Sequence, residues 1–196
     1  MTRTIRYRAA YVVCMALLAV AAFSVLRAFG STHAAVIVVV LLIVPGRVQG
    51  LLYRPLFRGQ RALASQKPAQ ALADFHQFLQ TIESQPWRKW ALWLSWSIYT
   101  PHANAMGLNN VGAAHAAMGE IDTAEAAWRQ ALVVDPLYAI PHANLAATAA
   151  SRGEADLAAK LLAEAARLGY SGGALDRATQ RVQQLLARVE SHGPSM

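Results

Sequence analysis

The N-terminal third of the chain lacks acidic residues altogether. Residues 1–73 contain nine lysines and arginines and no aspartate or glutamate, whereas residues 74–196 contain nine basic and eleven acidic residues. A nucleic-acid-binding protein carries its basic face on the folded module that docks, but here the excess of positive charge flanks two apolar runs. We therefore expect no nucleic-acid partner, and we interpret the high isoelectric point as a signal of membrane topology.

Cysteine and the common catalytic patterns are also scarce. The single cysteine, Cys14, lies in the first apolar run, which excludes an intramolecular disulfide and a cysteine metal cluster. The chain contains no zinc-binding helix motif, no CxxC pair, no glycine-rich phosphate loop and no nucleophile elbow. His102, His115 and His142 lack the carboxylate spacing of a metal site, so we expect His115 and His142 to have structural roles and His102 to be solvated near a helix start. The sequence predicts no enzymatic activity, no catalytic residue, no cofactor and no metal.

Two apolar runs dominate the first 53 residues. The first, Tyr11–Leu26, is almost purely apolar, and the second, Ala34–Val44, is rich in β-branched residues. With their flanks the runs approach the roughly 20 residues that cross a bilayer, and we predict a transmembrane helical hairpin with helices over about 9–29 and 33–52. Two alternatives stay open: residues 1–26 also fit a cleavable signal peptide, and the second run would be a buried strand in a soluble protein.

Basic residues lie on both outer flanks of this hairpin and are sparse in its turn. Three arginines precede the first run and five basic residues follow the second, whereas the turn offers only Arg27 and His33. The flanking residues are Arg3, Arg6, Arg8, Arg47, Arg54, Arg58, Arg61 and Lys67. By the positive-inside rule both flanks are cytoplasmic. We predict a multi-pass protein of the bacterial inner membrane, oriented N-in and C-in, with the remainder of the chain in the cytoplasm.

A motif of seven spaced residues occupies the segment 105–138. Its positions are Leu108, Val111, Gly112, His115, Ala124, Trp128 and Pro136. In these positions the segment resembles the tetratricopeptide repeat, a family built from 34-residue helix-turn-helix units. Leucine replaces the first tryptophan of the family pattern, and His115 replaces its tyrosine.

The same pattern recurs at a shift of 34 residues. Gly119-Glu120-Ile121-Asp122 returns as Gly153-Glu154-Ala155-Asp156, which indicates a second repeat over 139–172. Gly59, Ala71 and Phe75 fit a third, degenerate repeat. Each glycine is expected to end the first helix of its pair, and Asp122 with Glu125 predicts a capping box at the start of the next helix.

An insertion before the best repeat contains four tryptophans spaced by three residues, Trp87, Trp90, Trp93 and Trp96, followed by Tyr99. At 100° per residue of an α-helix they spread over half the circumference, which predicts a helix that is apolar nearly all round. Such a helix could be buried between the repeats and the hairpin, or it could lie in the membrane interface with Arg88 and Lys89 facing anionic lipid. It could also dock to a membrane partner.

The predicted fold is therefore all-α: a transmembrane helical hairpin followed by a short tetratricopeptide-like α-solenoid. Residues 1–53 form the membrane anchor, and residues 54–104 hold the degenerate repeat and the tryptophan-rich inserted helix. Residues 105–190 hold the two repeats, 105–138 and 139–172, and a C-terminal capping helix that covers the last apolar face. Residues 191–196 are expected to be a disordered tail.

The resemblance implies protein binding in a concave groove formed by the first helix of each pair. By the family pattern the groove residues are Met106, Asn109, Asn110, Ala113, Ala116, Ile140, Ala143, Asn144, Ala147 and Ala150. The basic residues with which some members clamp a terminal carboxylate are missing from these helices, so the groove favours a helix or an apolar segment, including one from the same chain. The alternative interpretation is that these alanines only pack a short solenoid.

We accordingly expect a membrane-anchored adaptor or scaffold that binds a protein partner or supports assembly of a membrane complex, and that contacts membrane lipid. The alternative is a structural accessory subunit of a larger membrane complex, docked through the hairpin and the Trp87–Trp96 helix. A third possibility is a periplasmic relative of the cytochrome c maturation chaperones. The short turn between the apolar runs and the basic residues after the second run disfavour it.

Overall fold

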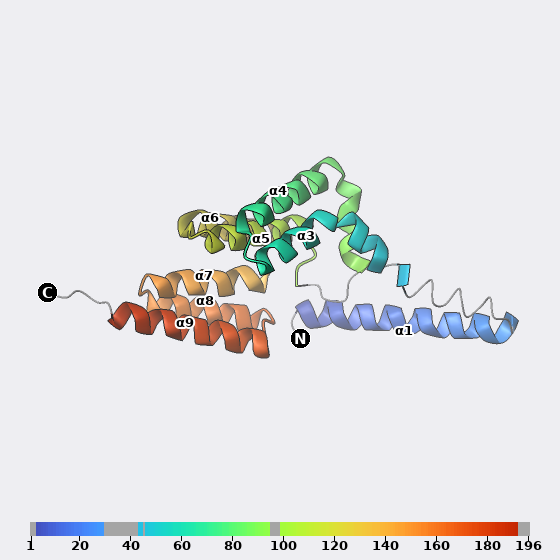
Figure 1. The fold of residues 1–196 in the computed structure, drawn as a ribbon. Helices are drawn as coiled ribbons and strands as arrows, with labels where there is room; N and C mark the ends of the chain where they lie inside the picture. Colours follow the sequence, from blue (N-terminus) through green and yellow to red (C-terminus); the bar gives the residue numbers. More distant parts are fainter. Residues whose placement is uncertain (1–2, 30–42, 45, 95–98, 192–196) are drawn as a thin grey trace.

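The computed structural model describes residues 3–29, 43–44, 46–94 and 99–191. Within these ranges the regular structure is helical and no strand occurs, which confirms the predicted all-α class (Figure 1). The elements are α1 (Arg3–Phe29), α3 (Arg54–Ala64), α4 (Pro68–Ser84), the 3₁₀ helix η1 (Pro86–Leu94), α5 (Ala103–Ala117), α6 (Ile121–Val134), α7 (Ala139–Ser151), α8 (Ala155–Arg167) and α9 (Gly173–Ser191). Residues 46–52 are also helical. The turn predicted at 30–33, most of the second predicted membrane helix and the predicted tail 192–196 lie outside the described residues.

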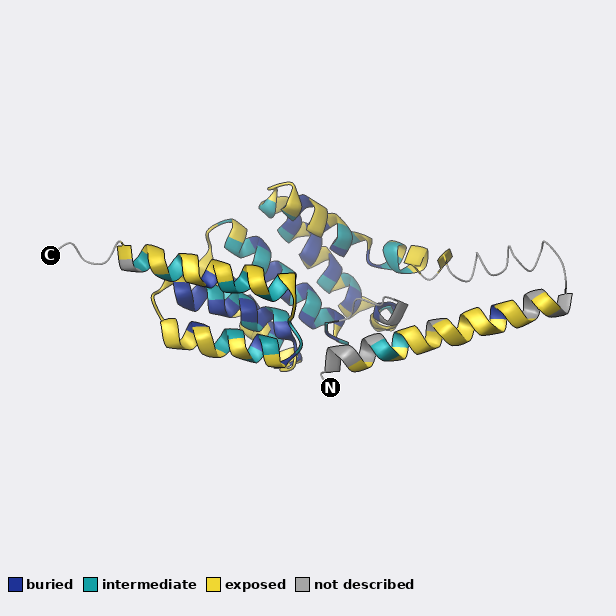
Figure 2. Ribbon diagram, turned by 90° about the horizontal axis from the view of Figure 1, so that it is seen from below, coloured by how far each residue is buried: buried dark blue, intermediate teal, exposed yellow. Residues whose placement is uncertain are grey.

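Helix α1 extends away from α3–α9, and its N-terminal end is the end nearest to them (Figure 1). Most of its surface is exposed (Figure 2), and the exposed side chains include Val12, Val13, Leu17, Leu18, Val20 and Phe23. In the parts of the chain that the structure describes, no helix is both long enough and apolar enough to cross a membrane. The predicted transmembrane hairpin stays a prediction.

Helices α3–α9 form a stack of helix pairs. The pairs are α3 with α4, α5 with α6 and α7 with α8, and α9 packs mainly on α7. Contacts of α4 with α5 and of α6 with α7 join successive pairs. This all-helical stack fits the predicted α-solenoid, because each pair buries its apolar face against its neighbours in the chain.

Two of the helix pairs are held by a glycine that faces an aromatic ring. A Cβ atom added to Gly112 would lie 2.5 Å from Trp128 Nε1, and one added to Gly59 would lie 2.5 Å from Phe75 Cε1. The glycine precedes the aromatic residue by the same sixteen positions in both pairs. The ring of the second helix therefore occupies the space that a side chain on the first would need, and glycine is the residue that allows this approach.

The turns inside the two predicted repeats have the same backbone geometry. Gly119 and Gly153 have φ of 82° and 76°, in the left-handed region that favours glycine. The amide of the next residue closes each turn: Glu120 N donates to His115 O at 3.0 Å, and Glu154 N donates to Ala149 O at 3.0 Å. The prediction that these glycines end the first helix of each pair is confirmed.

The capping box predicted for α6 is wrong. The N-cap residue of α6 is Glu120, and its side chain makes no capping hydrogen bond. Asp122 and Glu125 instead form ion pairs with Arg152 at the end of α7, at 2.7 and 2.6 Å. The two carboxylates thus join α6 to the next helix pair rather than satisfying the amides of their own first turn.

The tryptophan-rich segment forms a 3₁₀ helix over Pro86–Leu94, so the predicted α-helical distribution of its tryptophans is wrong. A 3₁₀ helix has three residues per turn, and residues three apart lie on the same side. Trp87 and Trp90 accordingly share one side and are 57 and 74% exposed, while Ala91 and Leu92 are buried. The side chain of Trp93 and the whole of Trp96 lie outside the described residues.

Candidate functional site

A hollow of about 420 Å³ opens on the inner side of the stack, where α5, α7 and α9 meet. Its lining residues are Leu63, Ala113, Ala116, Ala117, Ile121, Trp128, Asn144, Ala147, Thr148, Ser151, Arg181 and Leu185. The predicted groove residues Ala113, Ala116, Asn144 and Ala147 are among them, and they come from α5 and α7. We call this hollow the main groove.

The other predicted groove residues are spread over two smaller hollows and the core. Met106, Asn109, Asn110 and Ile140 line a hollow of about 200 Å³ beside Tyr99 and Tyr138. Ala143 lines one of about 160 Å³ next to α9, together with Asn144 and Ala147. Ala150 is completely buried in the core between α7, α8 and α9, so its assignment to the groove is wrong.

Asn109 has a structural role between three helices. Its carbonyl oxygen accepts a hydrogen bond from Trp128 Nε1 at 3.2 Å, and its side-chain oxygen accepts one from Asn144 Nδ2 at 3.0 Å. The residue is buried, and a buried amide group is normally satisfied within the protein. Asn109 therefore joins α5 to α6 and α7. Asn144, the donor of the second hydrogen bond, also lines the main groove.

Two arginines of α9 face the same inner side, and the sequence did not assign them to the groove. Arg181 lines the main groove, and both Arg177 and Arg181 line the smaller hollow next to Asn144. Within the described residues neither guanidinium has a carboxylate at ion-pair distance, whereas Arg129 and Arg167 each have one and Arg152 has two. Their spacing of four residues places both on one side of a helix. The sequence does not show whether that side faces the groove, because this depends on how α9 packs on α7.

Two tyrosines near these hollows, Tyr138 and Tyr170, have raised pKa values. Burial raises the pKa of the fully buried Tyr138, and the charge of Asp135 raises it further. Burial also raises the pKa of Tyr170, whose ring meets Tyr99 edge to face at 6.5 Å between centroids. Tyr99, predicted to belong to a docking surface with the tryptophans, is thus half-buried at the junction with the α8–α9 loop.

Within the described residues, the histidines do not converge on a site. His115 Nδ1 lies 2.5 Å from Glu120 Oε2, in the turn between α5 and α6. His142 Nε2 lies 3.4 Å from the Pro136 carbonyl oxygen, and His102 is exposed as the N-cap of α5. No group of three potential metal ligands occurs in the part of the chain that the structure describes.

The inner side of the stack therefore offers a shape and a charge that suit binding. Small apolar side chains form much of the main groove, Leu63 and Leu185 add larger apolar ones, and Arg181 supplies a positive charge. No model of a known protein family matches this chain, and a search of curated proteins finds no relative of it.

Proposed function

We propose that the protein is a membrane-anchored adaptor built on tetratricopeptide-type repeats, and that its main groove holds a helical or apolar segment of a protein partner. One observation carries this proposal: a hollow of about 420 Å³ lined by the alanines of α5 and α7 and bordered by Arg181. Binding sites are concave and mostly apolar, with a few polar groups that fix orientation. Arg181 has no carboxylate at ion-pair distance among the described residues, so it is suited to pair with an acidic residue of the partner.

The membrane part of the proposal is supported by the first third of the chain. Helix α1 presents exposed apolar side chains, and residues 1–73 carry basic residues without acidic ones. The N-terminal end of α1 lies near the helical stack while its other end points away (Figure 1). This arrangement is compatible with a hairpin whose two ends are on the same side. The proposed location is the inner membrane, N-in and C-in, with the repeats in the cytoplasm.

The groove is tested by two substitutions that act on different properties. Ala147→Arg fills the main groove with a long side chain, and Arg181→Glu reverses the charge at its border. The matched control is Lys160→Glu on the exposed outer side of α8. After gentle detergent extraction of native membranes, we expect a partner protein to co-purify with the wild type and the control and to be lost with both groove variants.

Equal recovery of the partner with the wild type, the control and both groove variants would show that the main groove does not bind this partner. That result would favour the accessory-subunit function, for which the exposed Trp87 and Trp90 are the supporting observation. In that case Trp90→Ala would abolish co-purification while the groove variants would not.

A further inference from the structure

Large apolar side chains remain exposed where residues 46–52 lead into the stack. Leu51, Trp87 and Trp90 are 70, 57 and 74% exposed. Neighbouring exposed side chains of this size usually mark a contact with another surface. We call these three residues and the basic residues beside them the tryptophan surface.

The tryptophan surface is held in place by hydrogen bonds between η1 and the end of residues 46–53. The Tyr53 hydroxyl donates to the Arg88 carbonyl oxygen at 3.1 Å, and Arg88 Nη1 donates to the Leu52 carbonyl oxygen at 3.2 Å. The Tyr53 side chain is completely buried and packs edge to face on Phe78. The exposed tryptophans therefore have a fixed position relative to the segment that follows the second apolar run.

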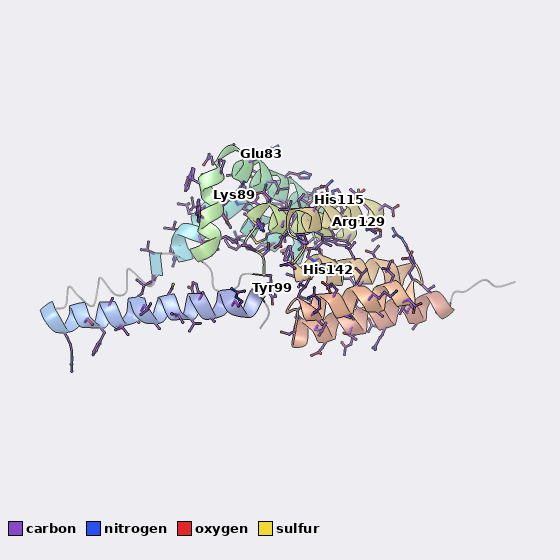
Figure 3. All side chains as sticks on the ribbon, turned by 180° about the vertical axis from the view of Figure 1, so that it is seen from behind. Glu83, Lys89, Tyr99, His115, Arg129 and His142 are labelled. Atoms are coloured by element: carbon purple, nitrogen blue, oxygen red, sulfur yellow. The ribbon has the colours of Figure 1, made fainter. Side chains whose placement is uncertain are left out.

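All charged residues of η1 and of residues 46–67 are basic. Arg47, Arg54 and Lys89 are exposed and form no ion pair within the described residues, and Arg88 stacks on Trp87 at 5.4 Å. No acidic residue occurs in η1 or in residues 46–67. The nearest acidic residue along the chain is Glu83 at the end of α4, which Figure 3 shows with Lys89. Tryptophan next to arginine and lysine is the composition typical of the headgroup region of a bilayer.

We infer that the tryptophan surface lies in the headgroup region of a membrane containing anionic lipid and sets the orientation of the helical stack relative to that membrane. The inference rests on the proposed membrane anchor, and it assigns a second contact beyond the anchor. Lipid phosphates pair with Arg54 and Lys89, while the rings of Trp87 and Trp90 lie at the level of the glycerol groups. An anionic bilayer supplies both partners at once, and the chain already leads there through residues 46–52.

The experiment measures tryptophan fluorescence of the full chain in vesicles of phosphatidylcholine and phosphatidylglycerol, with and without bromine near the headgroup end of the acyl chains. One variant keeps Trp90 as its single tryptophan and the control keeps Trp128, which is buried between α5 and α6. We expect brominated lipid to lower the emission of Trp90 by at least half and to leave that of Trp128 unchanged. Because replacing four tryptophans could disturb folding, the double variant Trp87→Phe/Trp90→Phe is measured too, and it should lose most of the bromine-dependent quenching of the wild type.

The outcomes separate this inference from the proposed function. A chain that fails to float with vesicles overturns the membrane anchor itself. A chain that floats while aqueous acrylamide quenches Trp90 and brominated lipid does not would overturn the inference and assign the surface to solvent or a protein partner. Equal quenching in pure phosphatidylcholine would overturn the role of anionic lipid. Quenching that increases with the phosphatidylglycerol content supports it.

Discussion

The two ends of the helical stack are built from side chains of different size. Tyr53, Phe75 and Phe78 are completely buried in the core of α3–α5. In the core of α7–α9 the buried residues are alanines and Val182, and the leucines packed against them are only partly buried. Each buried aromatic side chain removes much more apolar area from water than an alanine does. The difference indicates that the end of the stack next to the proposed anchor is the more stable end, while the end that carries α9 adapts more easily.

The largest effect is expected from removing an aromatic side chain at the stable end. Phe75→Ala leaves a cavity under α3 and should lower the free energy of unfolding by about 4 kcal/mol. Leu162→Ala, in the alanine-rich core, should cost about 2 kcal/mol because its side chain is only half-buried. Urea unfolding in detergent, followed by circular dichroism, measures both.

Val133→Ala serves as the control for that comparison, since Val133 is 83% exposed and its truncation should change the free energy of unfolding very little. If Phe75→Ala and Leu162→Ala destabilise the protein equally, the proposed difference between the two ends does not exist.

A double substitution tests whether the residues at one pair of positions account for the difference in helix packing between the two repeats. At a shift of 34 residues, Gly112 and Trp128 correspond to Ala146 and Leu162. Gly112→Ala alone should destabilise the protein by about 2 kcal/mol, because its Cβ would meet the indole at 2.5 Å. Combining it with Trp128→Leu copies the pair of the second repeat.

The stability of this double variant completes a double-mutant cycle with the two single variants. We expect the double variant to be more stable than the sum of the two single changes predicts, by about 1 kcal/mol. Gly50→Ala is the control, because an added Cβ there meets no atom within 4 Å. Strict additivity of the two single changes would show that the glycine does not accommodate the ring.

The smallest effect concerns the ion pairs that join the second repeat to the first. Arg129 and then Arg152 lower the pKa of Glu125. Its contribution to stability is therefore present above the ordinary glutamate pKa of about 4.3 and is lost as the pH falls through the lower value in the folded state. Glu125→Gln should reduce stability slightly near neutral pH and flatten the loss of stability in acid.

Thermal unfolding midpoints compared near neutral pH and below about pH 4 measure this change. Glu154→Gln is the control, since Glu154 forms no ion pair in the described part of the chain. Acid sensitivity that is identical in the wild type and Glu125→Gln would contradict a role for this carboxylate.

Features determined by local chemistry could be predicted from the sequence. Gly119 and Gly153 end their helices as expected, because a left-handed residue after a helix favours glycine wherever the helix lies. The all-helical class likewise follows from the periodicity of apolar residues. The membrane hairpin and the tetratricopeptide resemblance remain predictions.

Features determined by distant partners could not be predicted. The capping box failed because Arg152, which attracts Asp122 and Glu125, belongs to the next helix pair. The groove charge was missed because the rotation of α9 about its axis depends on its packing against α7, and that rotation brings Arg181 to the main groove. The 3₁₀ geometry of η1 accompanies hydrogen bonds to Leu52 and Tyr53, more than thirty residues earlier.

Those hydrogen bonds between η1 and Leu52 and Tyr53 also have a mechanical consequence. If only a single flexible linker joined residues 46–52 to the helical stack, the stack could rotate freely relative to that segment. The main groove would then have no fixed direction. In this structure residues 46–52 are joined to the stack in two places, through the backbone into α3 and through the hydrogen bonds of Tyr53 and Leu52 with Arg88. A rotation of residues 46–52 is therefore transmitted to α4 and to the helix pairs that follow it. Whatever holds that segment thus also determines the direction in which the main groove faces.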